Sequence, residues 1–104
     1  PAAPRMQAAL RTVREQIDRL SAASKAQALA RLALLYYEAG ERKQGMETEQ
    51  QFRQALPQAG GAAAEEPVRF LVESGLVFAE RARHAGALAE AEAWLRSVGL
   101  VVLR

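Results

Sequence analysis

Hydrophobic residues recur along the chain in runs with helical spacing, and glycine, proline or serine separates one run from the next. The first run places apolar side chains three and four positions apart, which predicts an amphipathic entry helix over about residues 5–20. Its apolar stripe consists of Met6, Ala9, Leu10, Val13, Ile17 and Leu20. Ser24 and Gln27 then fit a capping box that starts the next helix.

The second predicted helix covers about residues 25–39, and its apolar face is broad enough to pack on two sides. Gly40 ends this helix, because glycine adopts the left-handed conformation at low steric cost. A third helix begins near Arg42 or only near Thr48, since Gly45 weakens any helix that runs through it.

A loop rich in proline, glycine and alanine is predicted at residues 57–66, and a fourth helix follows at about 67–85. Gly75 lies within the wide apolar face of this helix, where close packing of another helix would justify a glycine. A fifth helix is predicted at 87–98. The apolar tail 99–104 is too short for a helix of its own and packs either on this domain or on a neighbour.

Alanine supplies much of the hydrophobic content, and β-branched residues occur only in short patches, so the natural class is all-α. We expect a single helical domain over residues 1–104, which is either a whole protein or a fragment of a larger one. In this domain the entry helix precedes two antiparallel helical hairpins, at about residues 25–56 and 67–98.

The second hairpin has an ordered series of small and large residues. Gly75 and Phe78 place a small and an aromatic residue three positions apart on its first helix. After the turn, small and bulky residues follow in the order Gly86, Leu88, Ala91 and Leu95. With this spacing the hairpin resembles a tetratricopeptide repeat, although its first helix is about one turn longer. The resemblance implies two repeat-like hairpins whose outer surface holds another protein.

We therefore expect a module for protein–protein interaction that binds a peptide or a partner helix as a scaffold, adaptor or regulatory domain, or that self-associates. The predicted partner-binding residues are Arg31, Tyr37, Arg42, Lys43 and Trp94. Tyr37 is either an exposed anchor or a side chain that fills the gap between the hairpins. Trp94 either packs under the terminal apolar run or lies in an interface.

Charge is unevenly distributed, because residues 1–31 carry a net charge of +4 and the remainder carries −2. A small excess of arginine is normal on an exposed face. It also permits an alternative function, a small helical subunit of a nucleoprotein complex. In that case Arg11 and Arg14, about one turn apart, would contact nucleic-acid phosphates. No aromatic residue in residues 1–31 provides a stacking platform for bases.

Catalytic chemistry has little support in the composition. The chain has no cysteine, and His84 and Asp18 are its only histidine and its only aspartate. Nothing in the sequence pairs these two side chains, so we expect no catalytic residue, no metal site and no cofactor. No signal peptide and no apolar run of membrane-spanning length occurs, which leads us to expect a cytoplasmic protein without membrane contact.

Overall fold

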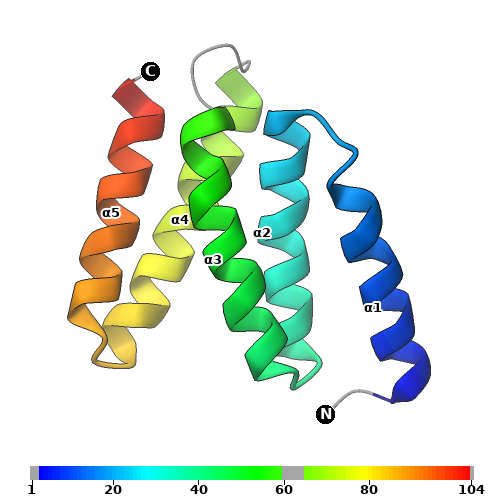
Figure 1. Ribbon diagram of the computed structural model, residues 1–104. Helices are drawn as coiled ribbons and strands as arrows, with labels where there is room; N and C mark the ends of the chain where they lie inside the picture. Colours follow the sequence, from blue (N-terminus) through cyan, green and yellow to red (C-terminus); the bar gives the residue numbers. More distant parts are fainter. Residues whose placement is uncertain (1–2, 60–64, 104) are drawn as a thin grey trace.

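The computed structural model describes residues 3–59 and 65–103, which form five α-helices and no strand. The helices are α1 (Pro4–Ile17), α2 (Ala22–Glu38), α3 (Arg42–Ala59), α4 (Glu65–His84) and α5 (Leu88–Leu103). They stand side by side as antiparallel rods, with α1 at one edge, α5 at the other and α3 in front (Figure 1). The protein is therefore all-α, as predicted, with antiparallel hairpins formed by α2 with α3 and by α4 with α5.

Both hairpin turns depend on a glycine in the left-handed region. Gly40 has a φ of 79° and Gly86 a φ of 78°. After the first of these, the backbone N–H of Glu41 donates to the carbonyl of Tyr36 at 2.9 Å, which closes a Schellman motif. The equivalent bond closes the second turn at the same length. The predicted role of Gly40 and Gly86 as helix stops is thus confirmed.

The two hairpins meet in a cluster of three aromatic rings. Phe52 of α3, Phe78 of α4 and Trp94 of α5 are completely buried. Their ring centroids lie 5.2–5.7 Å apart, within the range of favourable aromatic pairs. Because each ring comes from a different helix, the cluster fastens one hairpin to the other.

Close packing between α4 and α5 depends on small residues at their crossing. A Cβ added at Gly75 would overlap a methyl group of Val98, so a larger residue would require the Val98 side chain or α5 to shift. Ala91 is buried on the facing helix. The predicted reason for a glycine within this helix is thereby confirmed.

The boundary between the first two helices differs from the prediction. Helix α1 ends at Ile17 rather than near residue 20, and α2 begins at Ala22. Ser21 has extended backbone geometry just before α2, and its carbonyl accepts the N–H of Lys25 at 2.7 Å. The predicted capping box on Ser24 is therefore wrong, because Ser24 already lies within the first turn.

The predicted loop at residues 57–66 was too long. Helix α3 starts at Arg42, the earlier of the two predicted positions, and continues through Pro57. Proline removes one backbone donor, but buried Leu56 and Ala59 hold the last turn against the core. Since α4 begins at Glu65, only residues 60–64 remain for the connection, and they lie outside the described residues.

Helix α5 is longer than predicted, because Gly99 does not end it. The helix continues to Leu103, and the predicted tail forms its last turn. Val98 and Val101, on either side of the glycine, are both buried in the core. Their burial offsets the roughly 1 kcal/mol that glycine costs within a helix. Arg104 lies outside the described residues.

Only two of the six residues in the stripe predicted on the entry helix are buried. Leu10 and Ile17 of α1 join the core, whereas Met6, Val13 and Leu20 stay about half exposed. Helix α2 is the main neighbour of α1, so the flank of the stripe remains uncovered.

Candidate binding groove

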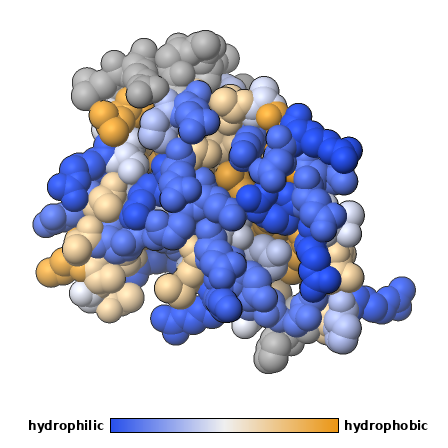
Figure 2. Space-filling model, viewed as in Figure 1, coloured by the Kyte–Doolittle hydropathy of each residue, from blue (hydrophilic) through white to orange (hydrophobic). Residues whose placement is uncertain are grey.

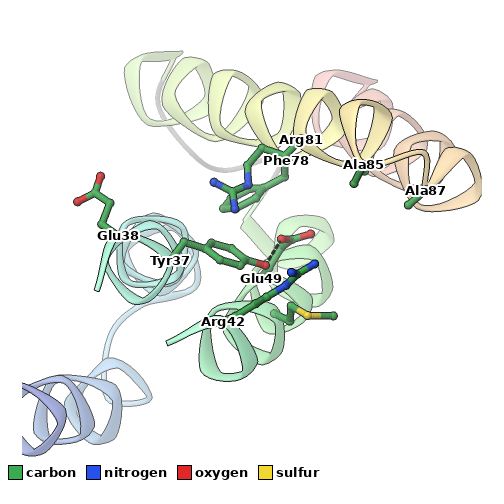
Figure 3. A pocket seen from close by; sticks show the side chains of 10 residues that line it. Tyr37, Glu38, Arg42, Glu49, Phe78, Arg81, Ala85 and Ala87 are labelled. Carbon is green, nitrogen blue, oxygen red and sulfur yellow. Dashed lines mark hydrogen bonds between the residues drawn. The ribbon is translucent and has the colours of Figure 1, made fainter. Parts of the chain in front are cut away.

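A groove of about 500 Å³ lies between the two hairpins, near the turns that end α2 and α4. Figure 3 shows side chains from α2, α3 and α4 gathered around it, with the turn into α5 at one end. We call this site the groove. It is lined by Tyr37, Glu38, Arg42, Met46, Glu49, Phe78, Arg81, Ala82, Ala85 and Ala87.

Tyr37 is held in the groove by contacts of its ring and of its hydroxyl. Its ring packs on α3 at Gly45, where an added Cβ would lie 2.9 Å from two ring carbons. On the other side, the guanidinium carbon of Arg81 lies 4.0 Å from the ring centroid, a cation–π contact. The hydroxyl donates to Glu49 Oε1 at 2.7 Å. The missing side chain at Gly45 therefore leaves the space that the Tyr37 ring occupies.

Burial raises the pKa of Tyr37 well above the ordinary value for tyrosine. The hydrogen bond to Glu49 and the negative charge of that carboxylate raise it further. At neutral pH Tyr37 is therefore a neutral hydrogen-bond donor, and this state suits its contact with a carboxylate.

Glu49 connects the two hairpins from inside the groove. Its Oε2 atom accepts the indole N–H of Trp94 at 3.0 Å, while Oε1 accepts the Tyr37 hydroxyl. One carboxylate thus joins side chains of α2, α3 and α5. Glu49 was not among the predicted residues, although it falls on the same face of α3 as Gly45 and Phe52, and this spacing is a detectable signal for a buried acid.

Two arginines give the groove its exposed positive charge. Arg42 comes from the first turn of α3 and Arg81 from the last part of α4, and both side chains are exposed. Neither forms a salt bridge within residues 3–59 and 65–103. Met46 also lines the groove and leaves about half of its surface exposed. The groove therefore offers cations and apolar surface together.

The predicted partner-binding residues do not all meet in this groove. Tyr37 and Arg42 line it, and Lys43 is exposed beside Arg42 without lining it. Arg31 lies elsewhere on α2, with its guanidinium carbon 4.5 Å from the centroid of the Phe70 ring. Arg81 was not predicted, because only the fold brings it opposite α2.

Trp94 requires a correction. Its side chain has no exposed surface, since it packs between Phe52 and Phe78 and donates to Glu49. It is a core residue, and the alternative that places it in an interface does not agree with this burial. The indole ring packs with the other two rings rather than only under the terminal apolar run.

The arginines predicted to contact phosphates have unequal surroundings. Arg14 is half-buried, and its guanidinium donates to Gln51 of α3 at 2.8 Å and to Asp18 at 3.2 Å. Arg11 is exposed, and no hydrogen bond links it to the rest of the described chain. Phosphate binding by Arg11 and Arg14 remains a prediction, because the two side chains do not lie free on one surface.

His84 is the last residue of α4 and is exposed, and its Nε2 lies 3.0 Å from Oε1 of Glu80. Within the part of the chain that is described, no group of three histidine, cysteine, aspartate or glutamate side chains is placed to hold a metal ion. In that same part, no helix has the length and apolar character needed to cross a membrane.

Comparison of the chain with protein-family models, with curated proteins and with solved structures found no match. The resemblance to tetratricopeptide repeats therefore remains a prediction.

Proposed function

We propose that this protein is a protein–protein interaction module that holds a segment of a partner chain in the groove. The observation that carries this proposal is the pair of exposed cations, Arg42 and Arg81, which line the groove together with Tyr37 and Met46. Interfaces are enriched in arginine, tyrosine and methionine, which combine apolar surface with directional hydrogen bonding. A scaffold, adaptor or regulatory role fits such a site, and the tetratricopeptide-like interpretation belongs to this proposal.

The partner segment is expected to carry a carboxylate next to an apolar side chain. Guanidinium groups bind carboxylates through charge-assisted hydrogen bonds, and Arg42 forms no salt bridge within the described chain. The thioether of Met46 and the alanines at the α4 end provide an adaptable apolar wall. Glu49 is already bound by Tyr37 and Trp94, so its charge is partly satisfied by the protein itself.

Selection from a displayed random-peptide library tests the proposal. We expect the wild-type protein to enrich peptides with acidic and apolar residues, and Arg42→Gln combined with Arg81→Gln to lose most of their affinity. The matched control replaces Arg5 and Arg19 with glutamine, which removes the same charge from exposed positions outside the groove. Equal binding of the selected peptides to wild type and to the groove variant would exclude the groove as the binding site.

A further inference from the structure

Helix α5 has a second apolar face that nothing in the described chain covers. Leu88, Leu95 and Val102 recur every seven residues and are 63%, 53% and 62% exposed. A seven-residue spacing keeps side chains on one flank of a helix, so the three form a stripe along the whole of α5. Figure 2 shows hydrophobic residues at the edge of the molecule that α5 occupies, beside a mostly hydrophilic face. We call these three residues the α5 stripe.

Gly99 gives this flank room for a closely packed helix. Gly45 and Gly75, the other glycines within helices, are each explained by a side chain that a Cβ would touch. At Gly99 an added Cβ would meet nothing within 4 Å, and its backbone conformation is helical. A glycine that lies next to the α5 stripe and faces open space leaves room for the backbone of a second helix to approach closely.

The charges beside the α5 stripe indicate which helix would pack on it. Glu92 and Arg96 lie between its residues and form no ion pair within the described chain. If a second α5 runs antiparallel and Leu95 faces the partner's Leu95, then Leu88 lies opposite the partner's Val102. In the same register Glu92 lies beside the partner's Arg96, and the two-fold axis generates this ion pair twice.

We propose that the protein forms a two-fold symmetric dimer through the α5 stripe, with the two α5 helices antiparallel about an axis at Leu95. An isologous interface requires a surface that is complementary to itself, and the stripe with its flanking charges satisfies this requirement. The small net charge of +2 opposes association only weakly. No residue of the α5 stripe lines the groove, so the dimer and the peptide site are tested by different variants.

Sedimentation velocity over a concentration series provides the first test. Wild type is expected to shift from monomer to dimer as its concentration rises, and Leu95→Glu is expected to stay monomeric. The matched control is Val13→Glu, which adds a charge to the exposed stripe of α1 and leaves the dimer intact. A wild type that is monomeric throughout, or a dimer that Val13→Glu abolishes and Leu95→Glu does not, would overturn the proposal.

Charge reversal tests the register. Glu92→Arg places like charges beside the partner's Arg96, and Arg96→Glu does the same with opposite sign, so each single variant should raise the dimer dissociation constant at least about tenfold. The double variant restores both ion pairs and should return the constant close to that of wild type. Additive losses in the double variant would contradict the antiparallel arrangement.

Gly99→Ala separates an interface role from a structural one. Alanine favours the helix and meets no atom within the chain, so the thermal stability of the monomer, measured in the Leu95→Glu background, should rise or stay constant. The dimer should weaken, because the added methyl group holds the helices apart. A dimer of unchanged affinity would show that no helix approaches at Gly99 and would refute this packing.

Discussion

Helix α1 and the aromatic cluster differ in the contacts that hold them in the fold. Buried rings hold the cluster together, whereas α1 depends largely on polar bonds. The cluster joins α3, α4 and α5 through three completely buried rings. Helix α1 buries only Leu10 and Ile17. Its remaining contacts are largely polar, such as the bonds from Gln7 to Glu41 at 2.7 Å and from Arg14 to Gln51 at 2.8 Å.

This difference separates a region that determines global stability from one that opens locally. Each buried aromatic ring contributes several kcal/mol, whereas a partly exposed hydrogen bond contributes about 0.5–1.5 kcal/mol net. We infer that α1 unfolds locally at a lower free energy than the two hairpins.

Phe78→Ala should produce the largest loss. The ring has no exposed surface and touches both other rings of the cluster, so its removal leaves a cavity shared by the two hairpins. The free energy of unfolding, measured by urea denaturation, should fall by about 3–5 kcal/mol. A matched truncation on the surface, Leu100→Ala, should change it by less than about 0.5 kcal/mol. A loss below about 1 kcal/mol for Phe78→Ala would contradict the central role of the cluster.

Ile17→Ala should have a smaller and more local effect. This side chain is buried between α1 and the core, but removing it can cost no more than the free energy that holds α1 in place. Hydrogen exchange should show a loss of about 1–2 kcal/mol of protection in α1, with little change in the amides around Phe52. Equal losses in both regions would mean that the molecule unfolds as one unit and that the contrast is wrong.

The contrast was only partly predictable from the sequence. Helical spacing predicted five helices, and the two turn glycines predicted where each hairpin bends. The same spacing placed the aromatic Phe78 one turn from Gly75, and the structure buries both residues. These features depend on residues near in sequence, whose arrangement on a helix follows from its geometry alone.

Other features depend on residues distant in sequence. The periodicity of α1 predicts an apolar stripe, but not that its neighbours cover only Leu10 and Ile17. Gly99 looks like a helix stop until Val98 and Val101 are known to be buried. In the groove, Tyr37 and Arg42 were predicted from their place on the first hairpin, whereas Arg81 enters only through the docking of the second.

The bond between Tyr37 and Glu49 is intermediate between these two extremes, because it is a polar contact within the first hairpin whose acceptor, Glu49, also bonds Trp94 of the second. Tyr37→Phe keeps the ring against Gly45 and Arg81 and removes only the hydroxyl. The free energy of unfolding at pH 7 should fall by about 1–2 kcal/mol. Tyr36→Phe, for which the structure gives no hydroxyl bond, is the matched control and should change it little.

The same variant has a pH signature. Because the pKa of Tyr37 is raised in the folded state, the unfolded chain gives up this proton first, near pH 10, and stability falls as the pH rises further. The contribution of the hydroxyl is therefore complete below pH about 10 and is lost above it. Urea denaturation of wild type and Tyr37→Phe between pH 8 and about 11.5 should give curves that converge. Parallel curves would mean that the Tyr37 pKa is unchanged by folding.

The smallest expected effect concerns the link between α1 and α2. The hydrogen bonds from Lys25 and Arg14 hold the pKa of Asp18 below its ordinary value, so this contact adds stability above the unfolded-state pKa and loses it as the pH falls through the folded-state value. In Lys25→Gln the NMR titration midpoint of the Asp18 carboxyl should rise toward that of an ordinary aspartate. Arg19→Gln, a change of equal charge on a neighbouring exposed position, should leave the midpoint in place. If both variants shift it equally, general charge rather than the Lys25 bond lowers the pKa. The ion pair between Asp18 and Lys25 would then be no stronger than the hydrogen bonds from Gln7 and Arg14 that also hold α1.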